Sequence, residues 1–341
     1  MRFCALLLLA VSFAHAQKLP FDVHALFKLS RVSDPQVSPD GVWVAFTVQT
    51  IDLEKNSKPR QIWIVPVAGG EPHAITKDGT VNDRPRWTPD SKRLVYVSNR
   101  SGSSQIWAMD PTGGNSRQIT NLSTEAAGVM VNPDGKGIVF TSDVFPDCNS
   151  DDCNKKKLDA EKANPVKARI YTTLLYRHWN EFEGARRRHI LTMALDGGTA
   201  RDLTPGTRHV PPFSLGGPDD YAVSPDGKEL CFVMNPDADA ATSTNAELFV
   251  VPMEGGDPKK IVINPGADNS PSYSPDGKWI AFRQQQRGGY EADRWRLMLL
   301  DRATGRTTSL TENLDRNVNG FAWQMDSKRV FFVTEDRGKT V

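Results

Sequence analysis

A four-residue turn that recurs along the chain constrains its fold more than any other feature of the sequence. Proline presets φ at the first corner of a turn, Asp can hydrogen-bond its own backbone two residues on, and Gly accepts a positive φ. Each copy therefore predicts a tight chain reversal. The copies are Ser-Pro-Asp-Gly at 38–41, 224–227 and 274–277, Thr-Pro-Asp-Ser at 88–91, Asn-Pro-Asp-Gly at 132–135, and a degenerate Gln-Met-Asp-Ser at 324–327.

Each turn is followed by a short run of β-branched and aromatic residues, which is typical of a buried strand. These runs are 42–48, 94–97, 138–140, 230–233, 279–282 and 330–333. A second hairpin is predicted in most units by Gly-Gly at 69–70, 113–114, 197–198 and 255–256, and by Thr-Gly at 304–305. One unit is therefore about four strands.

The spacing of the turns identifies the architecture. The Asp residues of successive turns are 50, 44, 92, 50 and 50 residues apart. A period of roughly 40–50 residues with four strands per unit predicts an all-β fold, the β-propeller, with six blades begun. The double interval is consistent with a degenerate blade or with one blade and an insertion. We favour an insertion at about 143–185, because the interval contains a single Gly-Gly tip and a polar stretch without a strand pattern.

Residues 1–16 have the pattern of a signal peptide. A positive start at Met1-Arg2 precedes an apolar run at 5–11 that is too short to span a bilayer, and Ala14-His15-Ala16 forms a small-x-small cleavage site. The alternative is a buried N-terminal helix or a membrane anchor. We expect export to the periplasm or the extracellular space, a propeller that begins at Gln17, and no membrane partner after cleavage.

Three cysteines remain after the leader is removed. Cys148 and Cys153 can close a small disulfide ring in an oxidising compartment, whereas Cys231 lies in a strand pattern and is expected to be a buried thiol. A metal site is the alternative for the first two. Their spacing to neighbouring Asp residues does not match a zinc site, so we favour the disulfide and expect no metal.

Charge and motifs exclude several classes of function. The net charge is +1 and the basic and acidic residues are interspersed, so we expect no nucleic-acid partner. The chain lacks a Gly-x-Ser-x-Gly nucleophile turn, a Gly-rich phosphate loop and a His-Glu-x-x-His motif. We therefore expect no catalytic residues and no cofactor within these 341 residues.

The segment 177–184 has the densest mixture of aromatic, acidic and basic side chains. One interpretation is a ligand-binding loop held by a rigid scaffold, in which Glu181 and Glu183 attract a positive group such as an amine. The other is a solvated hairpin whose charges pair with one another. On residue types alone the solvated hairpin is the more common structure.

The chain also resembles a known family. The stretch 29–41, the Asp- and Cys-rich insertion and the block Tyr176-Arg177-His178-Trp179 are similar to the N-terminal propeller of the prolyl oligopeptidase family, in its bacterial acylaminoacyl-peptidase and dipeptidyl-peptidase-like branch. The similarity extends over 22–341. It implies a C-terminal α/β-hydrolase domain beyond Val341, carrying Ser, Asp and His. Separately, six units are begun in this chain, and about one more, a seventh, would close a typical propeller ring.

The resemblance implies roles for particular residues as well. In dipeptidyl-peptidase branches, propeller carboxylates hold the amino group of a short peptide substrate, and the matching residues are Glu181 and Glu183, with Arg177 and Trp179 beside them. The family pattern has two adjacent glutamates, whereas Phe182 separates them in this chain. Alternation along a strand would still direct both carboxylates to one face.

Two hypotheses for function follow. The first is the propeller of an exported serine peptidase, which gates and orients short peptides for its own hydrolase domain. The second is a stand-alone exported propeller that binds a protein partner in the manner of TolB. The sequence leaves open whether copies of the chain form a homo-oligomer.

Overall fold

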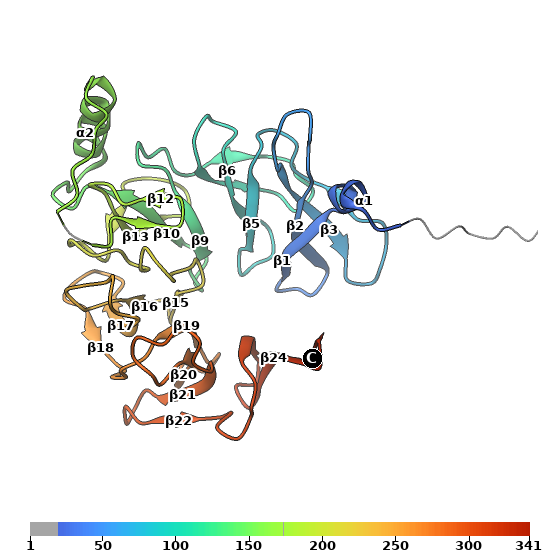
Figure 1. Cartoon of the computed structure of the whole chain (residues 1–341). Coiled ribbons are helices and arrows are strands. Elements are labelled where there is room, and N and C mark those ends of the chain that lie inside the picture. Colours follow the sequence, from blue (N-terminus) through green and yellow to red (C-terminus); the bar gives the residue numbers. More distant parts are fainter. Residues whose placement is uncertain (1–19, 173) are drawn as a thin grey trace, which may run out of the picture.

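The computed structural model describes residues 20–172 and 174–341, so the predicted signal peptide at 1–16 lies outside the described residues. The described chain forms a β-propeller of six antiparallel sheets, arranged around a common centre (Figure 1). Five sheets have four strands and the sixth has three. The predicted all-β propeller with four-stranded blades is confirmed.

The first three blades contain the N-terminal half of the fold. Blade 1 has β1 (Arg31–Val37), β2 (Trp43–Gln49), β3 (Arg60–Pro66) and β4 (His73–Ala74). Blade 2 has β5 (Asn82–Trp87), β6 (Leu94–Ser98), β7 (Gln105–Met109) and β8 (Arg117–Gln118). Blade 3 has β9 (Ala127–Val131), β10 (Gly137–Val144), β13 (Arg187–Ala194) and β14 (Arg201–Asp202).

The other three blades follow in sequence order. Blade 4 has β15 (Tyr221–Val223), β16 (Glu229–Met234), β17 (Glu247–Pro252) and β18 (Lys259–Lys260). Blade 5 has β19 (Asp268–Tyr273), β20 (Trp279–Gln284), β21 (Arg296–Asp301) and β22 (Thr307–Ser309). Blade 6 has β23 (Val318–Trp323), β24 (Val330–Asp336) and β25 (Lys339–Thr340).

The repeated turn connects the first two strands of every blade, as predicted. In all six copies the backbone N–H of the fourth turn residue donates to the carbonyl of the first, at 2.8–3.0 Å. In four copies the first residue is Ser or Thr, and its hydroxyl donates to the turn Asp carboxylate at 2.5–2.6 Å. The side chain therefore fixes the same reversal that the backbone makes.

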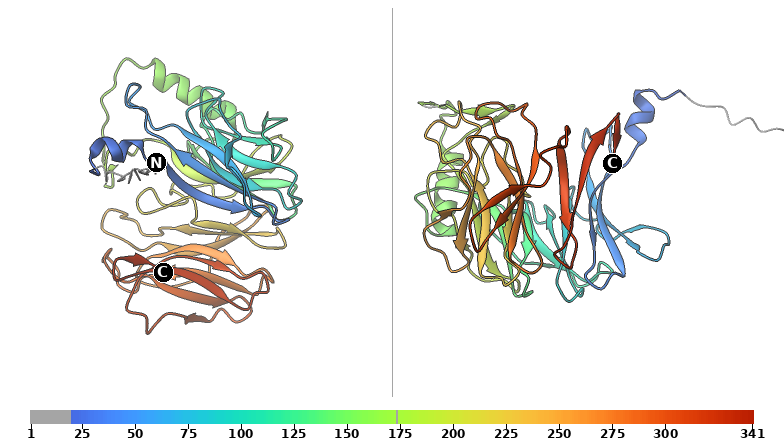
Figure 2. Two further views of the ribbon diagram at one scale, coloured as in Figure 1. Left: turned by 90° about the vertical axis from the view of Figure 1, so that its right-hand side faces the viewer. Right: turned by 90° about the horizontal axis from the view of Figure 1, so that it is seen from below.

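The apolar core lies between neighbouring blades. For example, Ala45, Ile62 and Ile64 of blade 1 pack against Leu94 and Tyr96 of blade 2. Similar clusters join each later blade to the next. Within the described ranges no such cluster joins blade 6 to blade 1, and the two blades face each other across an open side of the ring (Figure 2).

The long interval in the repeat contains one blade and an insertion. Strands β10 and β13 pair directly over eight residues, from Gly137↔Ala194 to Val144↔Arg187, so residues 145–186 connect two adjacent strands. The insertion includes α2 (Asp151–Ala163), which Ser150 caps. It also includes a hairpin of β11 (Arg177–His178) and β12 (Glu181–Phe182).

Helix α2 was not predicted, because it lacks the apolar periodicity of a core helix. Its start is fixed instead by polar contacts. The Cys148–Cys153 disulfide bridges the turn before the helix and its first residues. The Asp151 carboxylate accepts hydrogen bonds from the N–H and hydroxyl of Ser123, both at 2.9 Å, which tie α2 to the link between blades 2 and 3.

The other helix, α1 (Val23–Lys28), precedes blade 1 and has no buried residue. Neither helix in the described part of the chain is long and apolar enough to cross a membrane.

The direction of the strands defines two different faces of the propeller. The repeated turns and the Gly-Gly hairpins lie on one face, because they connect the first to the second and the third to the fourth strand of each antiparallel blade. The connections between second and third strands lie on the opposite face, together with the links between blades. We call this second face the loop face. It carries the insertion 145–186.

We predict a specific effect of the serine that replaces glycine in the second turn. Ser91 has a φ of 59°, and its hydroxyl accepts the backbone N–H of Asp40 in the neighbouring blade at 3.0 Å. Ser91→Ala loses this hydrogen bond and keeps the left-handed strain, so it should lower the free energy of unfolding by about 1 kcal/mol. Ser91→Gly also relieves the strain and should be close to neutral. Urea unfolding of both variants tests this, and equal destabilisation would contradict it.

The turn carboxylates predict a loss of stability in acid. The hydroxyl of Ser224, followed by the N–H of Lys228, lowers the pKa of Asp226 below 3.8, and the other Ser- or Thr-containing turns behave alike. A carboxylate whose pKa is lower in the folded than in the unfolded chain stabilises the fold above pH 3.8. This stabilisation is lost as the pH falls through the pKa of the folded state. The difference in unfolding free energy between wild type and Asp226→Asn should therefore be largest above pH 4 and shrink below it. A difference independent of pH between 6 and 3 would contradict the prediction.

Candidate functional site

One position near the first strand of every blade has a left-handed backbone in most of its copies. The position lies six residues before each turn Asp, on or beside the first strand of its blade, and is occupied by Asp34, Arg84, Gly128, Asp220, Ser270 and Gly320. Four of these have left-handed backbones: Asp34 (φ 51°), Arg84 (56°), Gly128 (65°) and Ser270 (52°). Each of the four coincides with a break in the strand register, and such bulges redirect side chains.

Arg84 connects blades that are not neighbours. Its Nη2 donates to the carbonyl of Pro218 at 2.7 Å and to Asp219 Oδ1 at 2.9 Å. Arg84 belongs to blade 2 and Asp219 precedes blade 4, so the contact passes over blade 3. Gly128 leaves room there, because a Cβ at that position would lie 2.5 Å from the Tyr221 hydroxyl oxygen.

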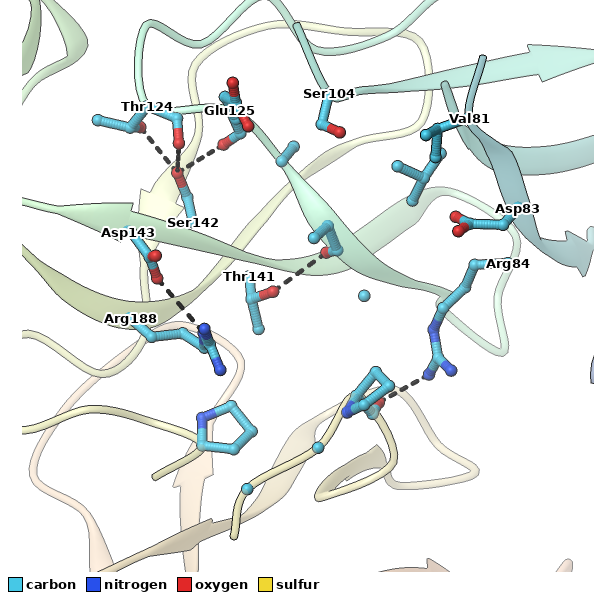
Figure 3. A pocket seen from close by; sticks show the side chains of 18 of the residues that line it. Val81, Asp83, Arg84, Ser104, Thr124, Glu125, Thr141, Ser142, Asp143 and Arg188 are labelled. Carbon is cyan, nitrogen blue, oxygen red and sulfur yellow. Dashed lines mark hydrogen bonds and ion pairs between the residues drawn. The ribbon is translucent and has the colours of Figure 1, made fainter. Parts of the chain in front are cut away.

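A pocket of about 420 Å³ opens beside this contact, on the loop face between blades 2 and 3 (Figure 3). Arg84 and Arg188 extend toward it from opposite sides. We call it the channel pocket. Its charged lining residues are Arg60, Asp83, Arg84, Glu125, Asp143 and Arg188.

The arginines of the channel pocket are already paired. Arg60 lies 2.8 Å from Asp83, Arg84 is held by Asp219, and Arg188 lies 3.3 Å from Asp143. The pocket therefore has nearly balanced charge, and its arginines are oriented for polar contacts without forming a strong positive field.

The predicted substrate-binding residues lie together on the β11–β12 hairpin. The register pairs His178 with Glu181, so Trp179 and the next residue form a two-residue turn. Trp179 has a φ of 49° and its side chain is 82% exposed. A left-handed backbone is unusual for a bulky residue, and Arg177 supports it by donating from Nη1 to the Trp179 carbonyl at 3.1 Å.

The two candidate glutamates have different surroundings. Glu183 Oε1 lies 3.2 Å from His209 Nε2 and 3.3 Å from Arg187 Nη2. Because His209 Nδ1 accepts the backbone N–H of Arg188, Nε2 carries the proton and donates to Glu183. This hydrogen bond, with the charge of Arg187, holds the pKa of Glu183 below its usual value.

Glu181 is exposed, and within the described residues its carboxylate has no hydrogen-bond or ion-pair partner. The structure therefore brings Glu181, Arg177 and Trp179 to an exposed hairpin tip, whereas Glu183 joins the hairpin to the segment that contains His209. Glu181 keeps both carboxylate oxygens for a charged ligand, whereas Oε1 of Glu183 is already engaged.

The segment 209–218 contacts both parts of the site. Phe213 lies against the hairpin, with ring centroids 6.3 Å from His178 and 5.2 Å from His209. Pro211 and residues 216–218 line the channel pocket. Gly216 is required at this bend, because a Cβ would lie 2.2 Å from the Pro212 carbonyl oxygen. The β11–β12 hairpin and the channel pocket are thus both supported by the segment 209–218.

Sequence reasoning missed the channel residues and the partners of Glu183. The channel position could have been found by extending the turn repeat six residues upstream. The segment 209–218 carried no comparable signal, since its importance comes from contacts made by folding. No group of three or more His, Cys, Asp or Glu in the described ranges is arranged to hold a metal ion.

Comparison with known proteins agrees with this geometry. A family model described as the TolB beta propeller domain matches residues 24–164. This part of the chain is similar to TolB-like β-propellers. The chain is also 33% identical over 318 residues to dipeptidyl-peptidase 5 of Porphyromonas gingivalis, an alignment that covers 92% of the propeller and 46% of the relative. The propeller thus spans less than half the length of this relative.

Solved structures show the same fold. An acylaminoacyl peptidase from Pyrococcus horikoshii superposes with a TM-score of 0.64 at 14% identity, covering 90% of the propeller and 43% of that chain. TolB from Acinetobacter baumannii superposes with a TM-score of 0.52 at 15% identity, covering 91% and 74%. The predicted resemblance to the propellers of such peptidases is confirmed.

We predict that His209 sets the acidity of Glu183. His209→Ala removes the hydrogen bond that contributes most to the lowered pKa, so the pKa of Glu183 should rise toward the ordinary value of 4.5. A ¹³C-detected NMR titration of the carboxyl groups measures it. His73→Ala, on the exposed strand β4, is the control. An unchanged Glu183 pKa in His209→Ala would show that the contact is absent in solution.

Proposed function

We propose that this propeller is part of an exported serine peptidase of the prolyl oligopeptidase family and gates and orients short peptides for a C-terminal α/β-hydrolase domain. The observation that carries the proposal is the alignment with dipeptidyl-peptidase 5 over 92% of the propeller, which occupies 46% of that relative. The remainder of such a protein has room for a catalytic domain of its own.

The loop face suits a role in peptide selection. The channel pocket, the exposed hairpin and the segment 209–218 all lie there. In this proposal the Arg84–Asp219 contact restricts passage along the channel, and only short or extended peptides reach the hydrolase domain. The balanced ion pairs of the channel pocket would contact peptide N–H and carbonyl groups without selecting strongly for charge.

Glu181 is the proposed acceptor for the substrate's amino group. Its carboxylate is exposed, unpartnered within the described residues and close in sequence to the exposed Trp179 ring. Glu183 has the supporting role, because His209 and Arg187 both engage its Oε1 and hold the carboxylate against the segment that contains His209. Arg177 keeps the hairpin turn in shape through the Trp179 carbonyl.

Export is part of the same proposal. The pattern of residues 1–16 is that of a leader, and the Cys148–Cys153 disulfide is the kind of bond that persists in an oxidising compartment such as the periplasm or the extracellular space.

The test uses the full-length natural protein and two chromogenic dipeptide substrates, one with a free amino terminus and one N-acetylated. We expect Glu181→Gln to lower kcat/KM for the free-amine substrate by roughly 10- to 100-fold, the cost of a charged hydrogen bond, and to leave the acetylated substrate unchanged. Glu161→Gln, on α2 of the same insertion, is the matched control.

The outcomes separate the two parts of the proposal. Hydrolysis that Glu181→Gln does not affect would reject the amine-binding role and keep the peptidase assignment. Absence of hydrolysis of either substrate would reject the peptidase assignment. In that case the alternative is a TolB-like propeller that binds a protein partner, which the TolB family match favours.

A further inference from the structure

A second pocket lies on the loop face between blades 4 and 5. Its volume is about 180 Å³, the space of roughly six water molecules or one amino-acid side chain. Its walls come from the segment 212–215, the connections 235–246 and 285–295, and the start of β19. We call it the inter-blade pocket. The proposed peptidase function does not use it.

The floor of the inter-blade pocket contains a buried carboxyl group with one unused oxygen. Asp268 is fully buried. Its Oδ1 accepts hydrogen bonds from Gln284 Nε2 at 2.9 Å and from Asn264 Nδ2 at 3.2 Å. Its Oδ2 is buried and has no hydrogen-bond partner within the described residues. A buried carboxylate oxygen without a partner is unfavourable, so a ligand that donates to Oδ2 would stabilise the ionised form of Asp268.

The charge of the lining is one-sided. Asp268 and Glu291 are its charged residues, and the lining includes no Lys, Arg or His. The nearby Lys260 does not neutralise Asp268, because its ammonium group pairs with the buried Glu247. This arrangement differs from the channel pocket, where three arginines are matched by acids.

The remaining walls suit the apolar part of a cation. Trp295 contributes an aromatic ring, which already has the Arg283 guanidinium 5.2 Å from its centroid, and Leu215 and Val233 contribute aliphatic surfaces. Aromatic rings attract ammonium and guanidinium groups, and aliphatic walls cover an alkyl chain. Acids, an aromatic ring and aliphatic side chains therefore surround one small volume.

We propose that the inter-blade pocket binds a single organic cation of side-chain size, an alkylammonium or guanidinium group, that donates a hydrogen bond to Asp268 Oδ2. The cation is either a small free amine or the side chain of a basic residue in a bound peptide. Glu291 lies at the exposed rim and would attract it.

The acidity of Asp268 gives this binding a pH dependence. Burial, reinforced by the charge of Glu247, raises the pKa of Asp268 to about 8. In the empty pocket the carboxyl group is therefore mostly protonated at pH 7, and a bound cation would displace the proton. The affinity should rise by up to roughly tenfold per pH unit between pH 6 and 8, and then level off.

Titration calorimetry of the chain with n-butylammonium chloride tests the proposal, with 1-pentanol as the neutral probe of similar length. We expect the wild type to bind butylammonium at least tenfold more tightly than pentanol at pH 8. Asp268→Asn should remove this preference while folding normally, because the amide replaces a protonated carboxyl group of the same shape. Asp257→Asn, on the exposed β17–β18 hairpin, is the matched control.

Three results would overturn the proposal: no preference for the cation, the same affinity in Asp268→Asn, or an affinity that falls between pH 6 and 8. A second titration with N-acetyl-lysine amide distinguishes the two sources. Binding of both probes indicates a peptide side chain, and binding of butylammonium alone indicates a small free amine. Because binding is measured without hydrolysis, the outcome is independent of the peptidase assignment.

Discussion

Apolar packing between successive blades is the interaction on which the rest of this structure depends. A four-stranded sheet of this length cannot bury its own apolar side chains, so Tyr96 of blade 2 or Phe232 of blade 4 becomes buried only against the adjoining blade. The same packing fixes the distance between neighbouring loops. The loop face therefore inherits its geometry from the core.

The segment 209–218 converts this regular scaffold into an asymmetric site. It links blade 3 to blade 4, and its side chains reach the hairpin through Phe213, the channel pocket through Pro211 and the inter-blade pocket through Leu215. His209 adds the hydrogen bond to Glu183. One link between blades thus supports the hairpin, the channel pocket and the inter-blade pocket, and displacement of this link would disturb all three together.

The two pockets show how different chemistry arises on one fold. In the channel pocket each arginine meets an acid from another strand or blade, which leaves a polar but nearly neutral surface. Near the inter-blade pocket, Lys260 is engaged by Glu247, and Asp268 remains without a basic partner within the described residues. The difference depends on where two or three charged side chains lie and not on the strands, which follow the same repeat in both places.

The sequence by itself determined the blades. The recurring Pro-Asp turn, the strand runs and the Gly-Gly tips are local signals, because turn chemistry and strand propensity act over a few residues, and each appears in the structure where it was predicted. The roles of Glu183, Arg84 and Asp268 were decided by the tertiary structure. Glu183 meets His209, Arg84 meets Asp219 from a blade that is not adjacent, and Asp268 loses its contact with water only when two blades close over it. Charge pairing and burial depend on groups that are distant in sequence, and no local pattern encodes which of them will meet.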